Sequence, residues 1–387
     1  MATDGSVYSD DESRATMLTP RGRGAVATVQ FEGDCRRIDE AGLFLAANGR
    51  CLASQEINRI VFGHWGTEPP EEVVLCRTSR ATVEIHCHGG DAAVGRVLDD
   101  LRQIGSTVSS WREMTRRTRG LFEMELLERL TQATTSRTAD ILLTQQSGLL
   151  RESLEKLLDE KQFATVEGRR DLEGRLTALL EWSEFGQHLT RPWTVVLAGR
   201  PNVGKSSLIN AMVGFTRAIV HERPGTTRDI VTAEVAIDGW PVLLSDTAGI
   251  RLTSEVLESA GIERARNQLE TAACRLLLLD TSRPPHADDL RLLADWPDAI
   301  RVAHKSDLPN VWGERLPADA LPVSSVTGDG VDTLTATVVA RLVPQVPPAD
   351  AAMPVSERQT TLLRAALNAI RQVDLPAWQN ALGDCLS

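Results

Sequence analysis

The stretch GRPNVGKS at residues 199–206 constrains the fold more than any other part of the sequence. It fits the pattern G-x-x-x-x-G-K-[ST] and lies between an apolar run typical of a buried strand, residues 194–198, and a helical pattern that continues to Met212. A phosphate-binding loop requires this context, because its glycines let backbone N–H groups converge on phosphate oxygens at a helix N-terminus. Lys205 is then expected at the β- and γ-phosphates and the Ser206 hydroxyl on Mg²⁺. The alternative is a glycine turn that only packs.

Strands and helices alternate in the residues after this loop. Apolar runs at residues 276–279 and 300–303 are separated by helical stretches, and two further runs flank Asp238-Gly239, a dipeptide that favours a tight hairpin. Such alternation predicts an α/β domain whose mostly parallel, doubly wound sheet is covered by helices on both faces. We place this nucleotide-binding domain at residues 191–342.

The stretch SDTAGIR, residues 245–251, raises a question of mechanism. Asp246 is expected to supply a carboxylate on the metal side of the phosphates, directly or through water, and Gly249 to lie beside the γ-phosphate. Ras-type GTPases continue this motif with a glutamine that orients the attacking water, whereas Ile250 has no polar atom. If the chain hydrolyses a nucleotide, another group must hold the water.

The segment RPGTTRD, residues 223–229, lies between these two motifs. We interpret it as a switch segment whose Thr227 reaches Mg²⁺ when a γ-phosphate is present. A plain Pro-Gly turn is the alternative.

The stretch HKSD, residues 304–307, predicts the choice of base. The carboxylate of Asp307 can accept from both N1–H and the exocyclic amine of guanine, a donor pair that adenine lacks. The usual pattern is Asn-Lys-x-Asp, so His304 before Lys305 is a departure. An imidazole cannot copy both amide contacts, and we expect weakened binding with the base choice kept. Ser324 and Ser325 follow at the spacing of the last base-contacting loop.

Length and composition set the outer limits. The 387 residues, 42% hydrophobic and 25% charged, are enough for two or three domains. Apolar runs are too short to span a bilayer, and the acidic start, residues 1–16, is expected to be a disordered lead-in, which favours the cytoplasm. The six scattered cysteines are expected to be free thiols. The net charge of −11 argues against wholesale nucleic-acid binding, although the arginine cluster at residues 112–119 is either an anion contact or a solvated face.

The remainder of the chain shows two different sequence patterns. Residues 17–117 mix short β-branched runs with glycine and proline, which predicts a small α+β domain. Residues 118–190 carry leucines at helical spacing. A further helix at about residues 356–373 is expected to pack back on these, so that residues 118–190 and 343–387 form one helical domain around the inserted nucleotide-binding domain.

Four motifs together resemble the tRNA modification GTPases of the MnmE (TrmE) family: GRPNVGKSSLINAMVG, PGTTRD, DTAGIR and ESAGIERA. The likeness is strong over residues 194–282 and extends in weaker form over 17–190. It implies GTP hydrolysis, a folate-type N-terminal domain, a homodimer formed through the N-terminal and GTPase domains, and a flavoprotein partner in wobble-uridine modification of tRNA.

The resemblance also implies an answer to the missing glutamine. Asn202 would help to bind K⁺, completed by His221, Arg223 and Thr226 in the switch segment, and Glu258 would position the water once two GTPase domains meet. A solvated glutamate at a helix start is the alternative for Glu258. The residues expected to contact GTP are Asn202, Val203, Gly204, Lys205, Ser206, Ser207, His221, Arg223, Thr226, Thr227, Asp246, Gly249, His304, Lys305, Asp307, Ser324 and Ser325.

The N-terminal half and the C-terminus depart from the family pattern. Glu84 matches a reduced-folate contact, but Gln30 and Leu127 stand where the family has an arginine and a lysine. The family ends in Cys-Ile-Gly-Lys, whereas this chain ends Asp-Cys-Leu-Ser with Cys385 third from the end. His86 and His88 share one strand face with Cys87 on the other, which argues against a metal site.

These observations leave two functions from different classes. The first is a K⁺-assisted GTPase of the tRNA-modifying type. The second is a GTP-gated switch or binding protein that no longer performs folate-dependent tRNA modification. A ribosome-assembly GTPase would need an RNA-binding module after residue 342, and about 45 residues without a basic or aromatic pattern follow.

Overall fold

The structure is a computed structural model that describes residues 13–20, 22, 24–216, 232–246 and 266–387. The chain forms two compact units, Met1–Met124 and Glu125–Ser387. None of the helices in the described ranges is both long enough and apolar enough to cross a membrane.

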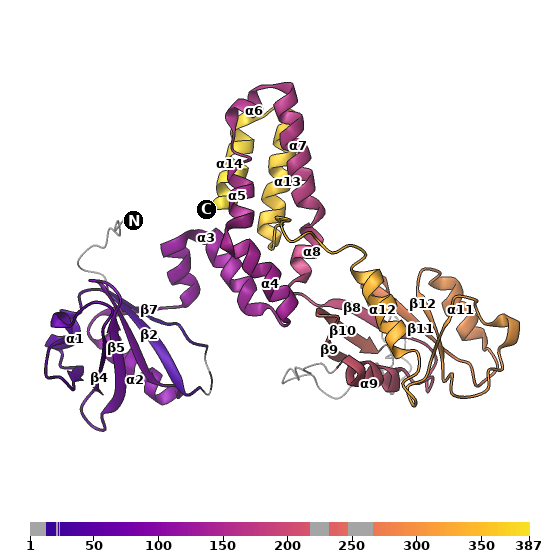
Figure 1. The fold of residues 1–387 in the computed structure, drawn as a ribbon, viewed down its shortest axis with the longest axis horizontal. Helices are drawn as coiled ribbons and strands as arrows, with labels where there is room; N and C mark the ends of the chain where they lie inside the picture. Colours follow the sequence, from indigo (N-terminus) through magenta and orange to yellow (C-terminus); the bar gives the residue numbers. More distant parts are fainter. Residues whose placement is uncertain (1–12, 21, 23, 217–231, 247–265) are drawn as a thin grey trace, which may run out of the picture. The chain divides into compact units, whose positions relative to one another are not determined.

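The N-terminal unit (Figure 1) is built on a seven-stranded sheet of order β3-β4-β5-β6-β2-β1-β7, in which only the β1–β7 pair is parallel. Helix α2 buries Val94, Val97 and Leu101 in the core of this unit. The elements are β1 (Ser13–Met17), β2 (Val26–Glu32), α1 (Arg36–Glu40), β3 (Phe44–Ala46), η1 (Leu52–Ser54), β4 (Ile60–Trp65), β5 (Glu71–Arg77), β6 (Thr82–His88), α2 (Asp91–Gln103) and β7 (Ser106–Ser109).

Strand β1 corrects one expectation. It begins at Ser13, inside the segment expected to be a disordered lead-in to residue 16. Its polar sequence SRATM gives little sign of a strand, but it lies between β2 and β7, and Ser13 and Thr16 are buried there with hydroxyl contacts to Ser106 and Ser109. Pairing with β2 and β7 therefore holds residues 13–17 in a strand, which the local sequence does not predict.

Helices follow in the next part of the chain. Helix α3 is broken at Gly120, where φ is 89°, and Gly148, with φ 122°, interrupts the π-helical turn η2. The elements are α3 (Trp111–Gln132), α4 (Ser136–Thr144), η2 (Gln145–Leu149), α5 (Leu150–Glu155), α6 (Glu160–Ala164), α7 (Val166–Glu181), α8 (Ser183–His188), α13 (Glu357–Gln372) and α14 (Leu375–Leu386).

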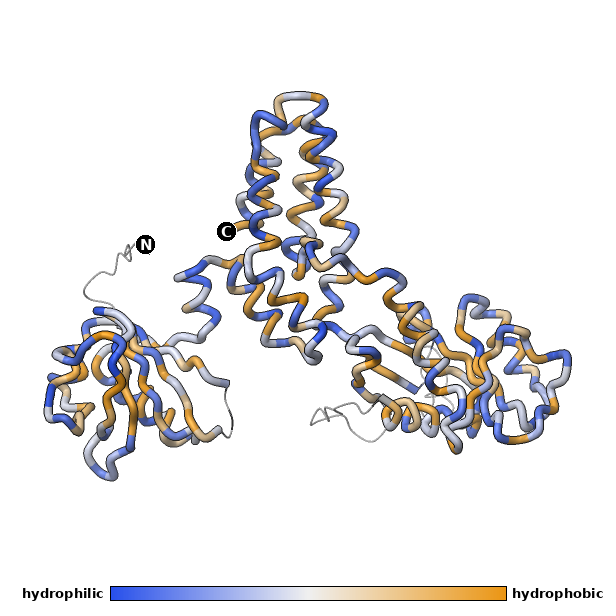
Figure 2. The backbone as a smooth tube through the Cα atoms, viewed as in Figure 1, coloured by the Kyte–Doolittle hydropathy of each residue, from blue (hydrophilic) through white to orange (hydrophobic). Residues whose placement is uncertain are grey.

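The C-terminal helices pack on the earlier ones, as expected for helix 356–373. Helix α13 contacts α7 and α14, and Figure 1 draws these helices side by side. Helix α7 buries Leu172 and Leu176, and α13 buries Leu363 and Ile370. Figure 2 shows hydrophobic and hydrophilic stretches alternating along both helices, which is the pattern of helices with one buried face.

The second sheet has six strands in the order β13-β12-β11-β8-β10-β9, all parallel except the edge strand β9. Helices α9 and α12 contribute residues to the hydrophobic core on one face of this sheet. Helix α11 packs against the core on the other face, so the expected doubly wound α/β sheet with helices on both faces is confirmed. The elements are β8 (Trp193–Ala198), α9 (Lys205–Thr216), β9 (Thr232–Ile237), β10 (Trp240–Asp246), β11 (Cys274–Asp280), α11 (Ala287–Asp295), β12 (Ile300–His304), η4 (Gly313–Arg315), β13 (Leu321–Val323) and α12 (Val331–Leu342).

The β9–β10 hairpin turns at Asp238 and Gly239, both with positive φ (50° and 77°), as the dipeptide predicts. The expected domain boundaries near residues 117, 190 and 342 stay predictions.

Candidate nucleotide-binding site

The phosphate loop connects the buried strand β8 to helix α9. Its backbone needs positive φ at Asn202 (63°) and Gly204 (103°), so the chain turns sharply before the helix starts. Lys205, the first residue of α9, is 5% exposed. Its Nζ donates to the carbonyl oxygens of Gly199 (2.9 Å) and Arg200 (3.2 Å), which holds the ammonium over the loop.

A hydroxyl and a carboxylate meet beside this loop. Strands β8 and β10 are parallel neighbours, so their carboxyl ends place Ser206 and Asp246 together. Ser206 Oγ donates to Asp246 Oδ2 at 3.1 Å, and Lys205 Nζ lies 3.8 Å from Asp246 Oδ1. Hydroxyl and carboxylate oxygens are ligands that Mg²⁺ prefers, and Mg²⁺ takes few protein ligands when phosphates supply the others. These two residues therefore fit a magnesium ion.

His304 ends strand β12 and is 2% exposed. Its Nδ1 lies 2.8 Å from the carbonyl oxygen of Val203 in the phosphate loop, and its Nε2 lies 2.7 Å from Ser325 Oγ. A Cβ atom at Gly204 would come within 2.4 Å of the ring. Burial lowers the pKa of His304 below its ordinary value, which keeps the ring neutral.

The residues after His304 have partners at the same end of the sheet. Lys305 Nζ lies 2.6 Å from Asp280 Oδ2 at the end of β11. Burial acts to raise the pKa of Asp280, but hydrogen bonds from Lys305 and Ser282 outweigh it, and the pKa lies below its usual value. Ser324 Oγ donates to Asp307 Oδ1 at 2.6 Å and so orients that carboxylate.

The carboxyl ends of parallel strands thus gather one set of predicted site residues at one edge of the sheet, where open α/β sheets bind their ligands. The set comprises Asn202, Val203, Gly204, Lys205, Ser206, Ser207, Asp246, His304, Lys305, Asp307, Ser324 and Ser325. Six predicted site residues, and Ile250, lie outside the described residues: His221, Arg223, Thr226, Thr227, Gly249 and Glu258.

Asp280 is the residue of this edge that the sequence reasoning did not single out. Its signal was present, because an aspartate ends the apolar run LLLLD at residues 276–280, as Asp246 ends another. A carboxylate at the end of a buried parallel strand is a candidate site residue on that ground alone.

The predicted folate residue lies in the N-terminal unit. Glu84 on β6 pairs in register with Gln30 on β2, and Gln30 Nε2 donates to Glu32 Oε1 at 2.9 Å. His86 contacts Thr28 through Nδ1 at 2.9 Å. Among the described residues, no group of three His, Cys, Asp or Glu side chains is placed to hold a metal ion.

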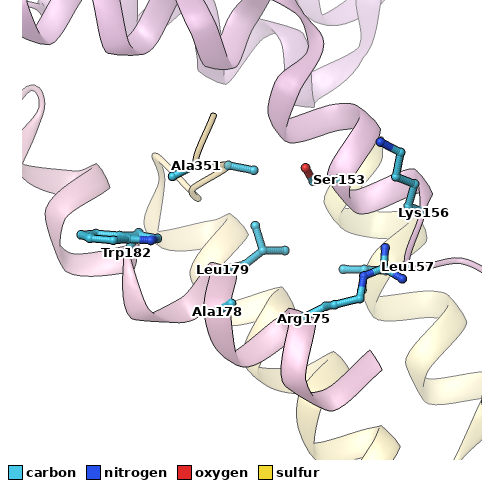
Figure 3. Close-up of a pocket in the computed structure, with 9 residues that line it drawn as sticks. Ser153, Lys156, Leu157, Arg175, Ala178, Leu179, Trp182 and Ala351 are labelled. Atoms are coloured by element: carbon cyan, nitrogen blue, oxygen red, sulfur yellow. The ribbon is translucent and has the colours of Figure 1, made fainter. Parts of the chain in front are cut away.

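A pocket of about 440 Å³ lies in the helical part and contains no predicted site residue. Figure 3 shows Trp182 and Leu179 on one side of it and Ser153 on the other, with Lys156 and Arg175 beside them. It is not part of the candidate nucleotide site.

Comparisons with known proteins found one family model, several similar sequences and several similar solved structures. Residues 194–305 match the family model described as "50S ribosome-binding GTPase". Among solved structures, an Era variant from Aquifex aeolicus is 24% identical over 46% of this chain and 66% of its own, with a TM-score of 0.30. The G domain of FeoB from T. maritima is 25% identical over 39% of this chain and 99% of its own, also at 0.30.

Several relatives are similar in sequence over more of the chain than its GTPase domain. The tRNA modification GTPase MnmE of Geobacillus kaustophilus is 33% identical over 76% of this chain and 73% of its own length. The protein of the same name from Bacillus subtilis is 31% identical over 78% and 75%, and that from Synechococcus sp. (strain CC9311) is 33% identical over 84% and 80%. With the phosphate loop, Asp246 and the edge of the parallel sheet in place, the chain belongs to the MnmE family of P-loop GTPases.

Proposed function

We propose that this GTPase couples hydrolysis of GTP to modification of the wobble uridine of tRNA. The observation that carries the proposal is the meeting of Lys205, Ser206 and Asp246 at the carboxyl edge of the sheet, in a chain a third identical to relatives named tRNA modification GTPase over three quarters of their length. The same edge carries Asp307, whose carboxylate selects guanine in this proposal.

In the hydrolysis step, a water oxygen bonds to the γ-phosphorus as the bond to the β-phosphate oxygen breaks, and GDP and phosphate are released. The ammonium of Lys205 stabilises the charge on the β- and γ-phosphate oxygens, and backbone N–H groups of the loop hold them in line. Ser206, Thr227 and Asp246 would hold Mg²⁺, which would supply further positive charge at these oxygens. Asn202, His221, Arg223 and Thr226 would hold K⁺, which would supply positive charge in the role of an arginine finger.

The water is aligned by Glu258 in this proposal, since Ile250 offers no polar atom. Glu258→Ala is therefore expected to leave the Kd for GTP unchanged within about twofold while it lowers the hydrolysis rate by about 100-fold, the contribution of a positioned acid–base group. Nucleotide titration and phosphate release on the same preparation separate the two effects. A variant that turns over as fast as the wild type would remove Glu258 from the mechanism.

The remaining parts of the proposal concern partners and location. The protein acts as a homodimer through its N-terminal and GTPase domains, binds a flavoprotein partner, contacts tRNA and takes a reduced folate at Glu84. Its place of action is the cytoplasm. The family resemblance supports these parts, and for the folate site it does so through Glu84.

A second function is favoured by specific observations: a GTP-gated switch without folate chemistry. Gln30 donates to Glu32, so its amide is engaged within the sheet. Cys385 is fully buried in α14, and burial raises the pKa of its thiol to about 12, so almost no thiolate exists at neutral pH. A buried, protonated thiol is a poor nucleophile, which disfavours a part for Cys385 in folate chemistry.

The deciding experiment compares wobble-uridine modification in tRNA from cells with and without the gene, by mass spectrometry of nucleosides. Loss of the modified nucleoside on deletion, and its return with the wild-type gene but not with Lys205→Ala, is expected for a modifying GTPase. Unchanged modification would favour the switch. Calorimetric titration with a reduced folate provides the second readout, because the switch has no use for that ligand.

A further inference from the structure

The imidazole of His304 stands where the usual motif has an asparagine, and its ring nitrogens both have partners within the protein. Nδ1 lies 2.8 Å from Val203 O, and Nε2 lies 2.7 Å from Ser325 Oγ. A carbonyl oxygen can only accept, so Nδ1 carries the proton and donates to Val203. In the neutral ring Nε2 has a lone pair, which accepts from the Ser325 hydroxyl.

Protonation would not free the ring for another partner. In the imidazolium form both nitrogens donate, and Nε2–H would still point at Ser325 Oγ, which has lone pairs to accept it. The in-plane hydrogen-bonding capacity of His304 is therefore used in either state. An asparagine amide differs, because it has two N–H donors and an oxygen with two lone pairs.

The ring is also held by packing. It is 2% exposed, and the space beside it is so tight that a Cβ at Gly204 would come within 2.4 Å of the ring carbon Cε1. Contacts with the phosphate loop and with Ser325 thus fix the ring from two sides. Burial lowers the pKa of His304, in line with a neutral ring at physiological pH.

Guanine presents different groups on its two edges. N7 and O6 are acceptors on one edge, whereas the exocyclic amine is a donor on the other. Asp307 can accept from the donor edge, and Ser324 Oγ orients its carboxylate from 2.6 Å. Recognition of N7 requires a donor, and the asparagine that usually occupies position 304 has N–H groups that can fill this role.

We propose that His304 is a positioning residue, which joins the phosphate loop to the Ser325 loop and makes no hydrogen bond to the base, so that the N7 atom of guanine is not recognised. This inference rests on the guanine-nucleotide binding proposed above and deepens it. The specificity of the site then depends on the donor edge of the base, through Asp307.

The test compares GDP with 7-deaza-GDP, in which a C–H group replaces N7, by calorimetric titration of the full-length protein with Mg²⁺. The wild type is expected to bind both with Kd values within about twofold. His304→Asn, which restores the usual amide, is expected to bind GDP about fivefold more tightly than 7-deaza-GDP, the worth of one net hydrogen bond. A merely structural role would change both Kd values together and leave their ratio near one in the variant.

The wild-type comparison needs no variant, so it decides the matter even if His304→Asn folds poorly. A wild type that prefers GDP over 7-deaza-GDP by about fivefold or more overturns the inference while leaving guanine-nucleotide binding intact. A ratio near one in both proteins also overturns it, because position 304 would then not control recognition of N7. Failure to bind either nucleotide contradicts the proposed function, and the inference falls with it.

Discussion

Gly204 leaves no room for a side chain beside the ring of His304. The glycine has φ 103°, in the left-handed region that side chains avoid, and its Cα faces the imidazole ring. Two independent reasons, backbone conformation and space, therefore exclude any side chain at this position. The phosphate loop therefore requires glycine at position 204.

Gly204→Ala is accordingly expected to abolish detectable GDP binding, because the added methyl would displace either His304 or the phosphate loop. Gly214→Ala is the matched control: Gly214 lies in α9, where an added Cβ would have no neighbouring atom within 4 Å, and the variant should gain about 0.5–1 kcal/mol of stability from the helix preference of alanine. Calorimetry gives the Kd and thermal unfolding the stability. Normal GDP affinity in Gly204→Ala would contradict this account of the loop.

Sequence reasoning predicted some residues of the site and could not predict others. Lys205, Ser206 and Asp246 are found together as expected, because their motifs have a fixed position at strand ends. The two hydrogen bonds of the His304 ring could not be predicted from the sequence. Val203 lies 101 residues away, and the contact with it depends on the order of the strands in the sheet. Only the weaker statement, that an imidazole cannot replace an amide, followed from the sequence.

At the scale of helices and strands, the sequence predicted the structure best where an apolar run in the sequence is also buried in the fold. The run at residues 194–198 became β8, and the two runs around Asp238 became a hairpin. Strands β1 and β7 were missed, because SRATM and STVS are polar and are ordered by pairing with each other and with β2. The pairing of these strands depends on residues far apart in the sequence, so the alternation of apolar and polar residues within each strand does not predict it.

Helix α13 is tied to its surroundings by Arg358. Its guanidinium donates to both carboxylate oxygens of Glu125, at 2.8 and 2.9 Å, and to the carbonyl oxygen of Asp384 near the end of α14 at 2.6 Å. The Glu125 side chain is 13% exposed and that of Arg358 26%, so this bidentate pair is largely shielded from water.

Arg358→Ala is therefore expected to lower the free energy of unfolding by about 2 kcal/mol, because it leaves the largely buried Glu125 carboxylate without its charged partner and with Ser356 and Gln359 as its remaining donors. Arg371→Ala is the control on the same helix: its pair with Glu173 is exposed, at 54% and 38%, and its loss should cost at most about 0.5 kcal/mol. Thermal unfolding of both variants measures the difference. Equal shifts in the two variants would show that the Glu125 contact has no special weight.

At the scale of the whole molecule, two histidines, the half-buried His188 and the buried His304, link stability to pH. Burial lowers the pKa of His188, which stacks on Trp193, as it lowers that of His304. Charged neighbours act on both rings: Glu184 and Arg191 on the first; Lys305, Asp280 and Asp307 on the second. In each case desolvation is the largest influence, so the folded protein resists protonation of the ring.

The unfolded chain then binds more protons than the folded one near the ordinary histidine pKa of about 6.5, so stability is complete above that pH and is lost as pH falls. The thermal midpoint is expected to fall between about pH 7 and pH 5.5, before most carboxylates titrate. Replacing both histidines by asparagine should flatten this dependence. A midpoint that stays constant across this interval in the wild type would refute the assignment.

The central claim is that the loop at residues 199–206 binds the phosphates of GTP and that Lys205 stabilises the charge that develops on them. The most direct measurement is phosphate release from GTP by the full-length protein in potassium buffer with Mg²⁺, for the wild type and for Lys205→Ala. The account predicts steady turnover by the wild type and a loss of at least about 100-fold in the variant. A wild type that neither binds nor hydrolyses GTP, or a variant that hydrolyses it as fast, would contradict the account.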